Sequence, residues 1–174
     1  MNGGTGADTA VTIRAVRVGD GAGCAEVWLD AARYYADLDP QNYQVPVKEG
    51  LVAWFEQINA EQQVGHLRLV ASRGDELLGL VWATLRPAAD DAGRSMVRTR
   101  GFPQVYVAAL AVRAGHRRTG VGTALMGEVE RWGRTHGAAL VSLDTNLHST
   151  MSVPVYEDRL GYQRHAVILQ KWLP

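Results

Sequence analysis

The sequence predicts a single α/β domain in which a mixed sheet has helices on both faces. The 174 residues fit one domain that can bury a core without disulfides or metals. Hydrophobic residues make up 47% of the chain and charged residues 21%, as in ordinary globular proteins. Apolar residues recur with the period of strands in some segments and of helices in others, and these segments alternate along the chain.

The first half of the chain predicts a strand, two helices and a hairpin. Asp39-Pro40 ends the first helix, because a proline disfavours helical geometry in the residue before it. A turn-rich connector at residues 73–76 separates the two hairpin strands. The predicted elements are a strand at 11–18, helices around 25–35 and 51–58, and strands at 67–72 and 77–85.

The second half predicts a strand, a crossover helix and a further strand at 104–112, 120–136 and 139–144. This order indicates neighbouring strands that are parallel or nearly so. The preceding loop, residues 87–103, is long and polar, which is typical of a functional or disordered loop. A last helix starts near Ser152, holds Pro154 in its first turn and ends at Leu160-Gly161, and residues 162–173 read as a strand.

Charge and composition argue against several classes of partner. The formal net charge is zero, so nothing indicates nucleic acid or a membrane surface. Residues 1–10 read as a flexible tail without the features of a signal peptide, and no apolar run approaches about 18 residues, so we expect a cytoplasmic protein. Cys24 is the single cysteine and lies on an apolar helical stripe, and the five histidines show no metal-ligand spacing. We therefore expect no metal.

The most informative segment is the turn between the strand at 104–112 and the helix at 120–136. It reads Arg117-Arg118-Thr119-Gly120-Val121-Gly122. Backbone N–H groups and a helix N-terminus meet at such a turn, and together they bind phosphate. Gly120 and Gly122 let the backbone approach an anion closely, since neither has a Cβ.

Two other glycine-rich phosphate motifs fit this turn less well. A dinucleotide fingerprint would need a third glycine where Leu125 stands. A P-loop would need Lys and Ser or Thr where Val121 and Gly122 stand. The remaining pattern is [QR]-x-x-G-x-[GA], filled by Arg117, Gly120 and Gly122.

With this turn, the chain resembles the GNAT N-acetyltransferase superfamily. The resemblance is densest over residues 110–125 and 155–162, and it extends in element order from Ile13 to about Trp172. It implies a largely antiparallel sheet of about six to seven strands flanked by about four helices over residues 11–174. It also implies acetyl-CoA as co-substrate and a homodimer as one assembly state.

The resemblance assigns site residues to both dense stretches. The late-helix tyrosine, Tyr156, is implied as the general acid that protonates the leaving thiolate. Ser149 stands where many members carry an asparagine that contacts the cofactor arm, and Asn146 is the alternative. Main-chain groups of Leu110, Ala111 and Val112 are implied to pair with pantetheine. The residues implied to hold the pyrophosphate are Arg117, Arg118, Thr119, Gly120, Val121, Gly122 and Thr123.

The chain departs from the family pattern at the general base. Many members carry a glutamate on the strand before the phosphate turn, whereas here Ala108 and Ala109 occupy that region. Tyr106, Asp144 or a water chain are the candidate substitutes. In this fold the first two helices and the loop before the cofactor strand usually form the acceptor wall. The acidic and aromatic residues of these segments, which would suit a cationic amine, are Tyr34, Tyr35, Asp37, Asp39, Tyr43, Asp90 and Asp91.

The predicted function is transfer of an acetyl group from acetyl-CoA to a primary amine of a small molecule or peptide. Direct attack in a sequential mechanism is expected, because Cys24 lies far from the motif and no other nucleophile is evident. The alternative is a non-catalytic acyl-CoA-binding or sensing module, which the missing acid on the strand would favour. A nucleotide-phosphate enzyme is the third reading.

Overall fold

The computed structural model describes residues 10–61 and 63–173, which belong to two compact units. The first unit ends at Asp144 and the second begins at Thr145. The predicted tail, residues 1–10, lies outside the described residues except for Ala10. The prediction of one domain over residues 11–174 stays a prediction. Within the described residues, no helix has the length and apolar character needed to cross a membrane.

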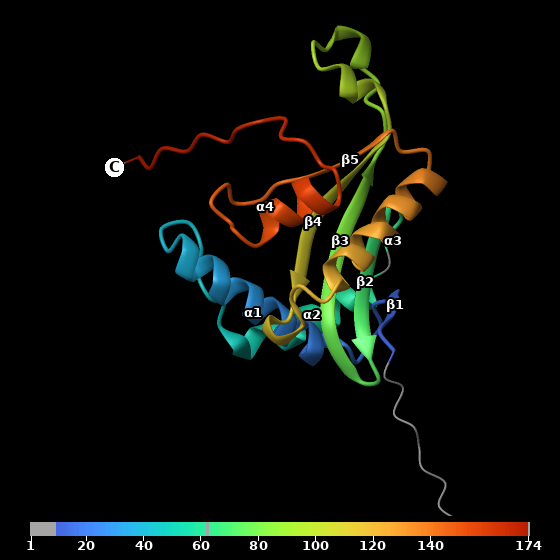
Figure 1. Ribbon diagram of the computed structural model, residues 1–174. Coiled ribbons are helices and arrows are strands. Elements are labelled where there is room, and N and C mark those ends of the chain that lie inside the picture. Colours follow the sequence, from blue (N-terminus) through green and yellow to red (C-terminus); the bar gives the residue numbers. More distant parts are fainter. Residues whose placement is uncertain (1–9, 62, 174) are drawn as a thin grey trace, which may run out of the picture. The chain divides into compact units, whose positions relative to one another are not determined.

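The first unit contains one five-stranded sheet whose strands follow one another in chain order (Figure 1). Neighbouring strands are antiparallel from β1 to β4, whereas β4 and β5 are parallel. The parallel pair is the one joined by a crossover helix, as the sequence predicts. The strands are β1 (Thr12–Ala15), β2 (His66–Arg73), β3 (Glu76–Arg86), β4 (Gln104–Val112) and β5 (Leu140–Leu143).

The prediction of about six to seven strands is wrong for the described residues, which form five strands in a sheet of mixed orientation. The missing strand is residues 162–173, which have no regular secondary structure. Val167, Ile168 and Leu169 favour a strand by composition, but a strand also needs a neighbouring backbone to bond with. Local composition therefore overestimated the size of the sheet.

Helices cover both faces of the sheet. α1 (Gly21–Leu38) and α2 (Lys48–Ala60) share a buried cluster with Leu80 of β3. The next residue back along β3, Gly79, faces α3 (Val121–Thr135), where an added Cβ would lie 3.1 Å from Leu125 and from Val121. Because successive residues of a strand point to opposite faces, α3 packs on the face opposite α1 and α2. The predicted helix over 120–136 is thus confirmed as α3.

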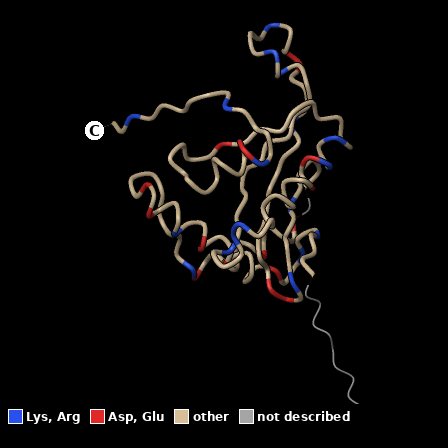
Figure 2. Tube along the Cα trace, viewed as in Figure 1, with Lys and Arg blue, Asp and Glu red and all other residues tan. Residues whose placement is uncertain are grey.

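The loop at 87–103 contains two short 3₁₀ turns, Ala92–Arg94 and Arg98–Gly101, and is held by its own contacts. The Ala89 N–H donates to the Arg100 carbonyl at 2.8 Å, and the Arg100 guanidinium pairs with Asp91 at 2.8 Å. Figure 2 shows charges of both signs on this loop. In Figure 1 the loop extends beyond the ends of β3 and β4 at which Arg86 pairs with Gln104.

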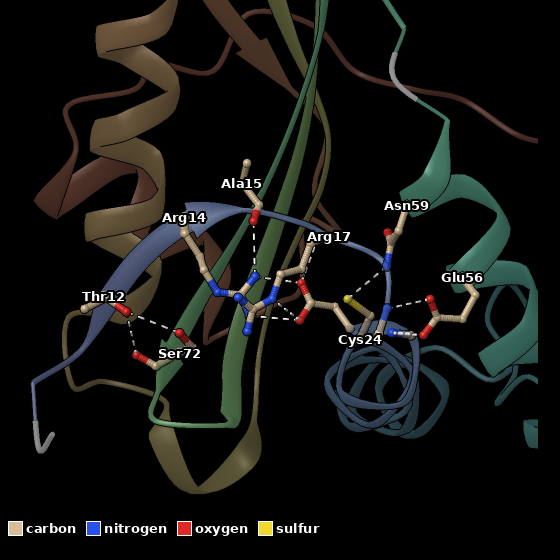
Figure 3. A network of polar contacts seen from close by, with 11 residues as sticks. Thr12, Arg14, Ala15, Arg17, Cys24, Glu56, Asn59 and Ser72 are labelled. Carbon is tan, nitrogen blue, oxygen red and sulfur yellow. Dashed lines mark hydrogen bonds and ion pairs between the residues drawn. The ribbon is translucent and has the colours of Figure 1, made fainter. Parts of the chain in front are cut away.

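A polar network joins β1, α1 and α2 (Figure 3). The guanidinium of Arg14 donates to both carboxylate oxygens of Asp20, at 2.7 and 2.8 Å, and the Arg17 N–H donates to the same carboxylate at 2.9 Å. Glu56 of α2 accepts hydrogen bonds from the N–H groups of Gly19 and Gly21, at 2.9 and 2.8 Å. Since the first N–H groups of a helix lack intrahelical partners, Glu56 caps α1 from the neighbouring helix.

The second unit contains the predicted last helix. It consists of a short α-helical turn, α4 (Ser152–Pro154), and a π-helical turn, Val155–Arg159. The Leu160 N–H donates to the Val155 carbonyl, five residues earlier, at 3.1 Å. Gly161 follows with φ +73°, a left-handed conformation that favours glycine and ends a helix. The predicted start near Ser152, with Pro154 in the first turn, is confirmed.

Candidate functional site

The strand β4 pairs with β5 over only the first half of its own length. It pairs with β3 from Gln104 to Val112, but with β5 only from Gln104 to Val107. Among residues 10–61 and 63–173, no strand therefore pairs with the edge of β4 beyond Val107 on the β5 side. Backbone N–H and C=O groups along such an edge can pair with an extended ligand.

A bulge interrupts β4 at the point where it leaves β5. Trp82 of β3 lies opposite Ala109 and Ala83 lies opposite Val107, so Ala108 is an extra residue without a partner on β3. Bulges change which face the following side chains occupy. Val105, before the bulge, packs on α3 at Gly133.

After the bulge, Leu110 and Val112 also face α3. A Cβ added at Gly122 would lie 3.6 Å from Val112 and 3.9 Å from Leu110. Strict alternation from Val105 would have put both side chains on the opposite face. The bulge thus brings the free part of β4 against the N-terminal turn of α3.

The turn from Arg117 to Thr123 ends at the N-terminus of α3. Arg118 has φ 64° and Gly120 has φ 93°, and both values lie in the left-handed region. The first intrahelical hydrogen bond runs from the Ala124 N–H to the Gly120 carbonyl at 2.9 Å. The three helical N–H groups before Ala124 therefore have no acceptor within the helix. Basic residues gather at this turn (Figure 2). The turn therefore has the N–H groups and the charge to bind a phosphate.

Arg117 has contacts that the sequence did not predict. Its guanidinium donates to the carbonyl of Val112 at 3.2 Å and to the carbonyl of Asp30 on α1 at 2.8 Å. It also lies over the ring of Tyr34, 5.6 Å from the ring centre. These donors hold the turn against α1, so part of the charge expected at the phosphates is used within the chain. That Arg117 also contacts phosphate stays a prediction.

Tyr156 and Ser149 belong to the second unit. Tyr156 is half-buried on the π-helical turn, and its ring packs edge to face with Tyr162 at 5.9 Å. Ser149 is 2% exposed, and its Oγ accepts hydrogen bonds from the Ser152 N–H at 3.0 Å and the Ser152 hydroxyl at 2.6 Å. Ser149 thus has a local role, in which its hydroxyl holds the first residue of the last helix. The cofactor roles of both residues stay predictions.

The predicted acceptor wall is brought together only in part. Tyr35 packs against Tyr34 and against Tyr43, with ring centres 5.2 and 5.1 Å apart. Tyr34 lies near the end of β4 that leads into Arg117, whereas the loop at 87–103 extends from the other end of this strand. Asp90 and Asp91 of this loop are therefore separated from the tyrosines by the length of β4. Asp37 and Asp39 lie at the C-terminal end of α1, as the tyrosines do.

Sequence reasoning missed an aromatic cluster next to the bulge. The ring of Trp82 stacks on Trp28 at 5.5 Å and lies 5.7 Å from the ring of Trp54, which is 43% exposed. Trp82 stands directly opposite Ala109 on β4. The three tryptophans come from separate segments of the chain, so their convergence at one point depends on the register of the sheet and on the packing of α1 and α2.

Cys24 is buried and is unsuited to be a nucleophile. Only 1% of its surface is exposed, and burial raises the pKa of its thiol to about 11. A thiol, unlike a thiolate, is a poor nucleophile. Within residues 10–61 and 63–173, no group of three or more His, Cys, Asp or Glu side chains could hold a metal ion.

The fold agrees with comparisons to known proteins. Residues 25–162 match the model of the Acetyltransferase (GNAT) family. A search of curated proteins finds no match.

Three solved structures share the fold. A tetramutant of the BH1408 protein from Bacillus halodurans has a TM-score of 0.78 and 16% identity, over 93% of this chain and 99% of that one. A ribosomal-protein-alanine N-acetyltransferase from Brucella melitensis biovar Abortus 2308 has a TM-score of 0.64 and 16% identity, over 94% and 99%. AAC(6')-Iy, in complex with the bisubstrate analog CoA-S-monomethyl-acetylneamine, has a TM-score of 0.61 and 22% identity, over 95% and 99%. Because the family match covers most of its length, this chain belongs to the GNAT family of acetyltransferases.

Proposed function

We propose that this protein transfers the acetyl group of acetyl-CoA to a primary amine of a small molecule or peptide. One observation carries the proposal: the half of β4 that lacks β5 as a partner leads directly into the Arg117–Thr123 turn. An extended pantetheine arm suits the free strand edge, and a pyrophosphate suits the turn. Family membership supports acetyl transfer as the chemistry.

The residues of the turn fit a bound pyrophosphate. Among the described residues, and apart from its chain neighbours, no atom lies within 4 Å of a Cβ built on Gly120. A Cβ on Gly122 meets side chains of β4 at ordinary contact distances. The backbone there is open enough for an anion to approach the N–H groups closely. Main-chain groups of Leu110, Ala111 and Val112 would bind pantetheine, and the amides of residues 118–123 would bind the phosphates.

The proposed reaction is a direct attack of the amine nitrogen on the thioester carbonyl. Strand N–H groups next to the bulge would polarise this carbonyl and stabilise the oxyanion that forms. The burial of Cys24 supports a mechanism without an acetyl-cysteine intermediate. The sulfur that leaves then needs a proton, for which Tyr156 is the proposed donor.

Replacing Tyr156 with Phe should lower turnover and leave acetyl-CoA affinity nearly unchanged. The hydroxyl is removed while the ring that packs on Tyr162 is kept. A positioned general acid contributes typically about 10²–10⁴-fold, so we expect kcat to fall by about 100-fold. Steady-state kinetics and calorimetric titration with acetyl-CoA measure the two quantities. Tyr162→Phe is the matched control and should keep kcat; a wild-type kcat in Tyr156→Phe would reduce Tyr156 to a packing role.

Two structural neighbours suggest which amines to test. One is named for ribosomal-protein alanine, and the other was solved with an analog that contains acetylneamine. A suitable panel is neamine, an alanine-terminated peptide, spermidine and arginine amide. The acidic and aromatic residues at the end of α1 are consistent with such cationic acceptors.

Release of free thiol from acetyl-CoA in the presence of each amine tests the proposed function. We expect at least one amine to accelerate the release well above the rate without acceptor. Binding of acetyl-CoA without acceptor-dependent release would favour the acyl-CoA-sensing alternative, which the absence of an acid at Ala108 and Ala109 motivates. Tight binding of ATP without binding of acetyl-CoA would favour a nucleotide-phosphate enzyme.

A further inference from the structure

A tyrosine and an aspartate meet where β5 ends. The hydroxyl of Tyr106 on β4 donates to Oδ2 of Asp144 at 2.8 Å. The guanidinium of Arg86 on β3 lies over the ring of Tyr106, 4.0 Å from its centre. Arg86 and Tyr106 thus lie on adjacent strands, and Asp144 directly follows β5. Tyr106 lies two residues before the bulge at Ala108, beside the point where β4 and β5 separate.

Tyr106 points to the face of the sheet opposite α3. Its neighbour Val105 packs on Gly133 of α3, and adjacent strand residues point to opposite faces. Tyr106 is also in register with Thr84, two residues along β3 from Trp82. This distance is about 7 Å along a strand. The tyrosine and the aromatic cluster around Trp82 therefore share one face, next to the strand edge proposed for the acetyl donor.

The hydrogen bond fixes the protonation of the pair. Donation to Asp144, with burial and the negative charge of that carboxylate, raises the pKa of Tyr106 above its ordinary value. Tyr106 therefore keeps its proton and donates it in the hydrogen bond to the Asp144 carboxylate. Asp144 is exposed, and in the part of the chain that the structure describes, no cationic side chain forms an ion pair with it. Oδ1 is not the oxygen to which Tyr106 donates, so a ligand can bind there.

We propose that Asp144 binds the ammonium group of the acceptor amine and takes the protons that the nitrogen loses before and during formation of the C–N bond, with Tyr106 as the positioning residue. This inference rests on the proposed function, and it supplies a general base in place of the acidic residue that β4 lacks. Asp144 first takes one proton from the bound ammonium and passes it to water, which frees the nitrogen lone pair. The lone pair then attacks the thioester carbon, and a second N–H proton passes to the carboxylate of Asp144. The C–S bond then breaks with its electron pair going to sulfur, which takes a proton from the general acid. Asp144 returns its proton to the surrounding water, and the general acid takes a proton back from water.

Substitution of Asp144 tests the inference with the fastest acceptor among neamine, the alanine-terminated peptide, spermidine and arginine amide. In Asp144→Asn we expect kcat/KM for the amine to fall by about 100-fold or more, because positioned acid–base groups contribute typically about 10²–10⁴-fold. The fall should come from both a higher KM for the amine and a lower kcat. Affinity for acetyl-CoA and its slow hydrolysis without amine should not change. Asp144→Glu should restore part of the activity.

Tyr106→Phe should lower kcat/KM in the wild-type background and have little further effect in Asp144→Asn, because the two residues act as one unit. Asp75→Asn, which changes an exposed aspartate in the turn between β2 and β3, is the matched control and should behave as wild type. Wild-type kcat/KM in Asp144→Asn overturns the inference and leaves the proposed function intact. A rise in KM alone overturns the proton-accepting role. If the wild-type protein acetylates no amine, the proposed function fails and the inference fails with it.

Discussion

Gly122→Asp should weaken the binding of acetyl-CoA by about 100-fold or more. The new carboxylate would repel the pyrophosphate and crowd the N–H groups at the start of α3. Losing one or two charge-assisted hydrogen bonds, at about 1.5–3 kcal/mol each, is enough for this effect. The fold should tolerate the change, because a Cβ at Gly122 stands 3.6 Å from Val112 and an acidic residue suits the first turn of a helix. Calorimetric titration with acetyl-CoA measures the dissociation constant.

Two further variants separate charge at the turn from general effects of the substitution. Gly127→Asp places the same charge on the same helix, at a position where a Cβ meets nothing within 4 Å, and should keep the wild-type affinity. Gly122→Ala adds only the Cβ and should have an intermediate affinity. An unchanged dissociation constant in a folded Gly122→Asp protein would refute the phosphate-binding role of the turn.

Asp20→Asn should lower the free energy of unfolding by about 3 kcal/mol at pH 7, the lower end of the range for breaking a buried ion pair. Asp20 is 7% exposed and accepts three hydrogen bonds, two of them from the Arg14 guanidinium. Without the carboxylate, Arg14 loses its partner and β1 loses its link to α1. Urea unfolding, followed by tryptophan fluorescence, measures the difference between variant and wild type.

The effect of Asp20→Asn should depend on pH. Burial alone would raise the pKa of Asp20, but the hydrogen bonds from Arg14 and Arg17 outweigh it, and the pKa is lowered. A carboxyl group with a lowered pKa stabilises the fold at pH values above its pKa in the unfolded chain, which is about 3.9. This contribution is lost as the pH falls through the pKa in the folded protein. The difference between variant and wild type should therefore be constant from pH 5 to 8 and shrink at lower pH. Asp91→Asn, which breaks the exposed ion pair with Arg100, should lower the free energy of unfolding by only about 0–1 kcal/mol. An equal decrease in both variants would contradict the role given to Asp20.

Local patterns predicted the elements that depend on local chemistry. The helix that follows the phosphate turn was expected at 120–136 and spans Val121–Thr135, because its apolar spacing and the glycines at both ends act within a few residues. The start of the last helix near Ser152 was predicted for the same reason. Residues 162–173 show the limit, since their apolar composition favours a strand but the described sheet ends at β5.

Several site features depend on contacts between distant residues. Arg117 matches the phosphate pattern in sequence, yet its guanidinium reaches the carbonyl of Asp30, 87 residues earlier. Tyr106 and Asp144 were both candidates for the base, but their pairing follows from the parallel register of β4 and β5. The bulge at Ala108 leaves no mark in composition, because alanine has no special preference for such a position. Spacing within one segment could not have predicted these arrangements.

The most direct test of the central claim follows a labelled acetyl group from acetyl-CoA. The protein is first incubated with labelled acetyl-CoA alone, and an accepted amine from the panel is added afterwards. Direct transfer predicts no label bound covalently to the protein before the amine is added, and then one labelled amide formed for each CoA released. Label that stays on the protein, or CoA release without a labelled amide, would contradict this account.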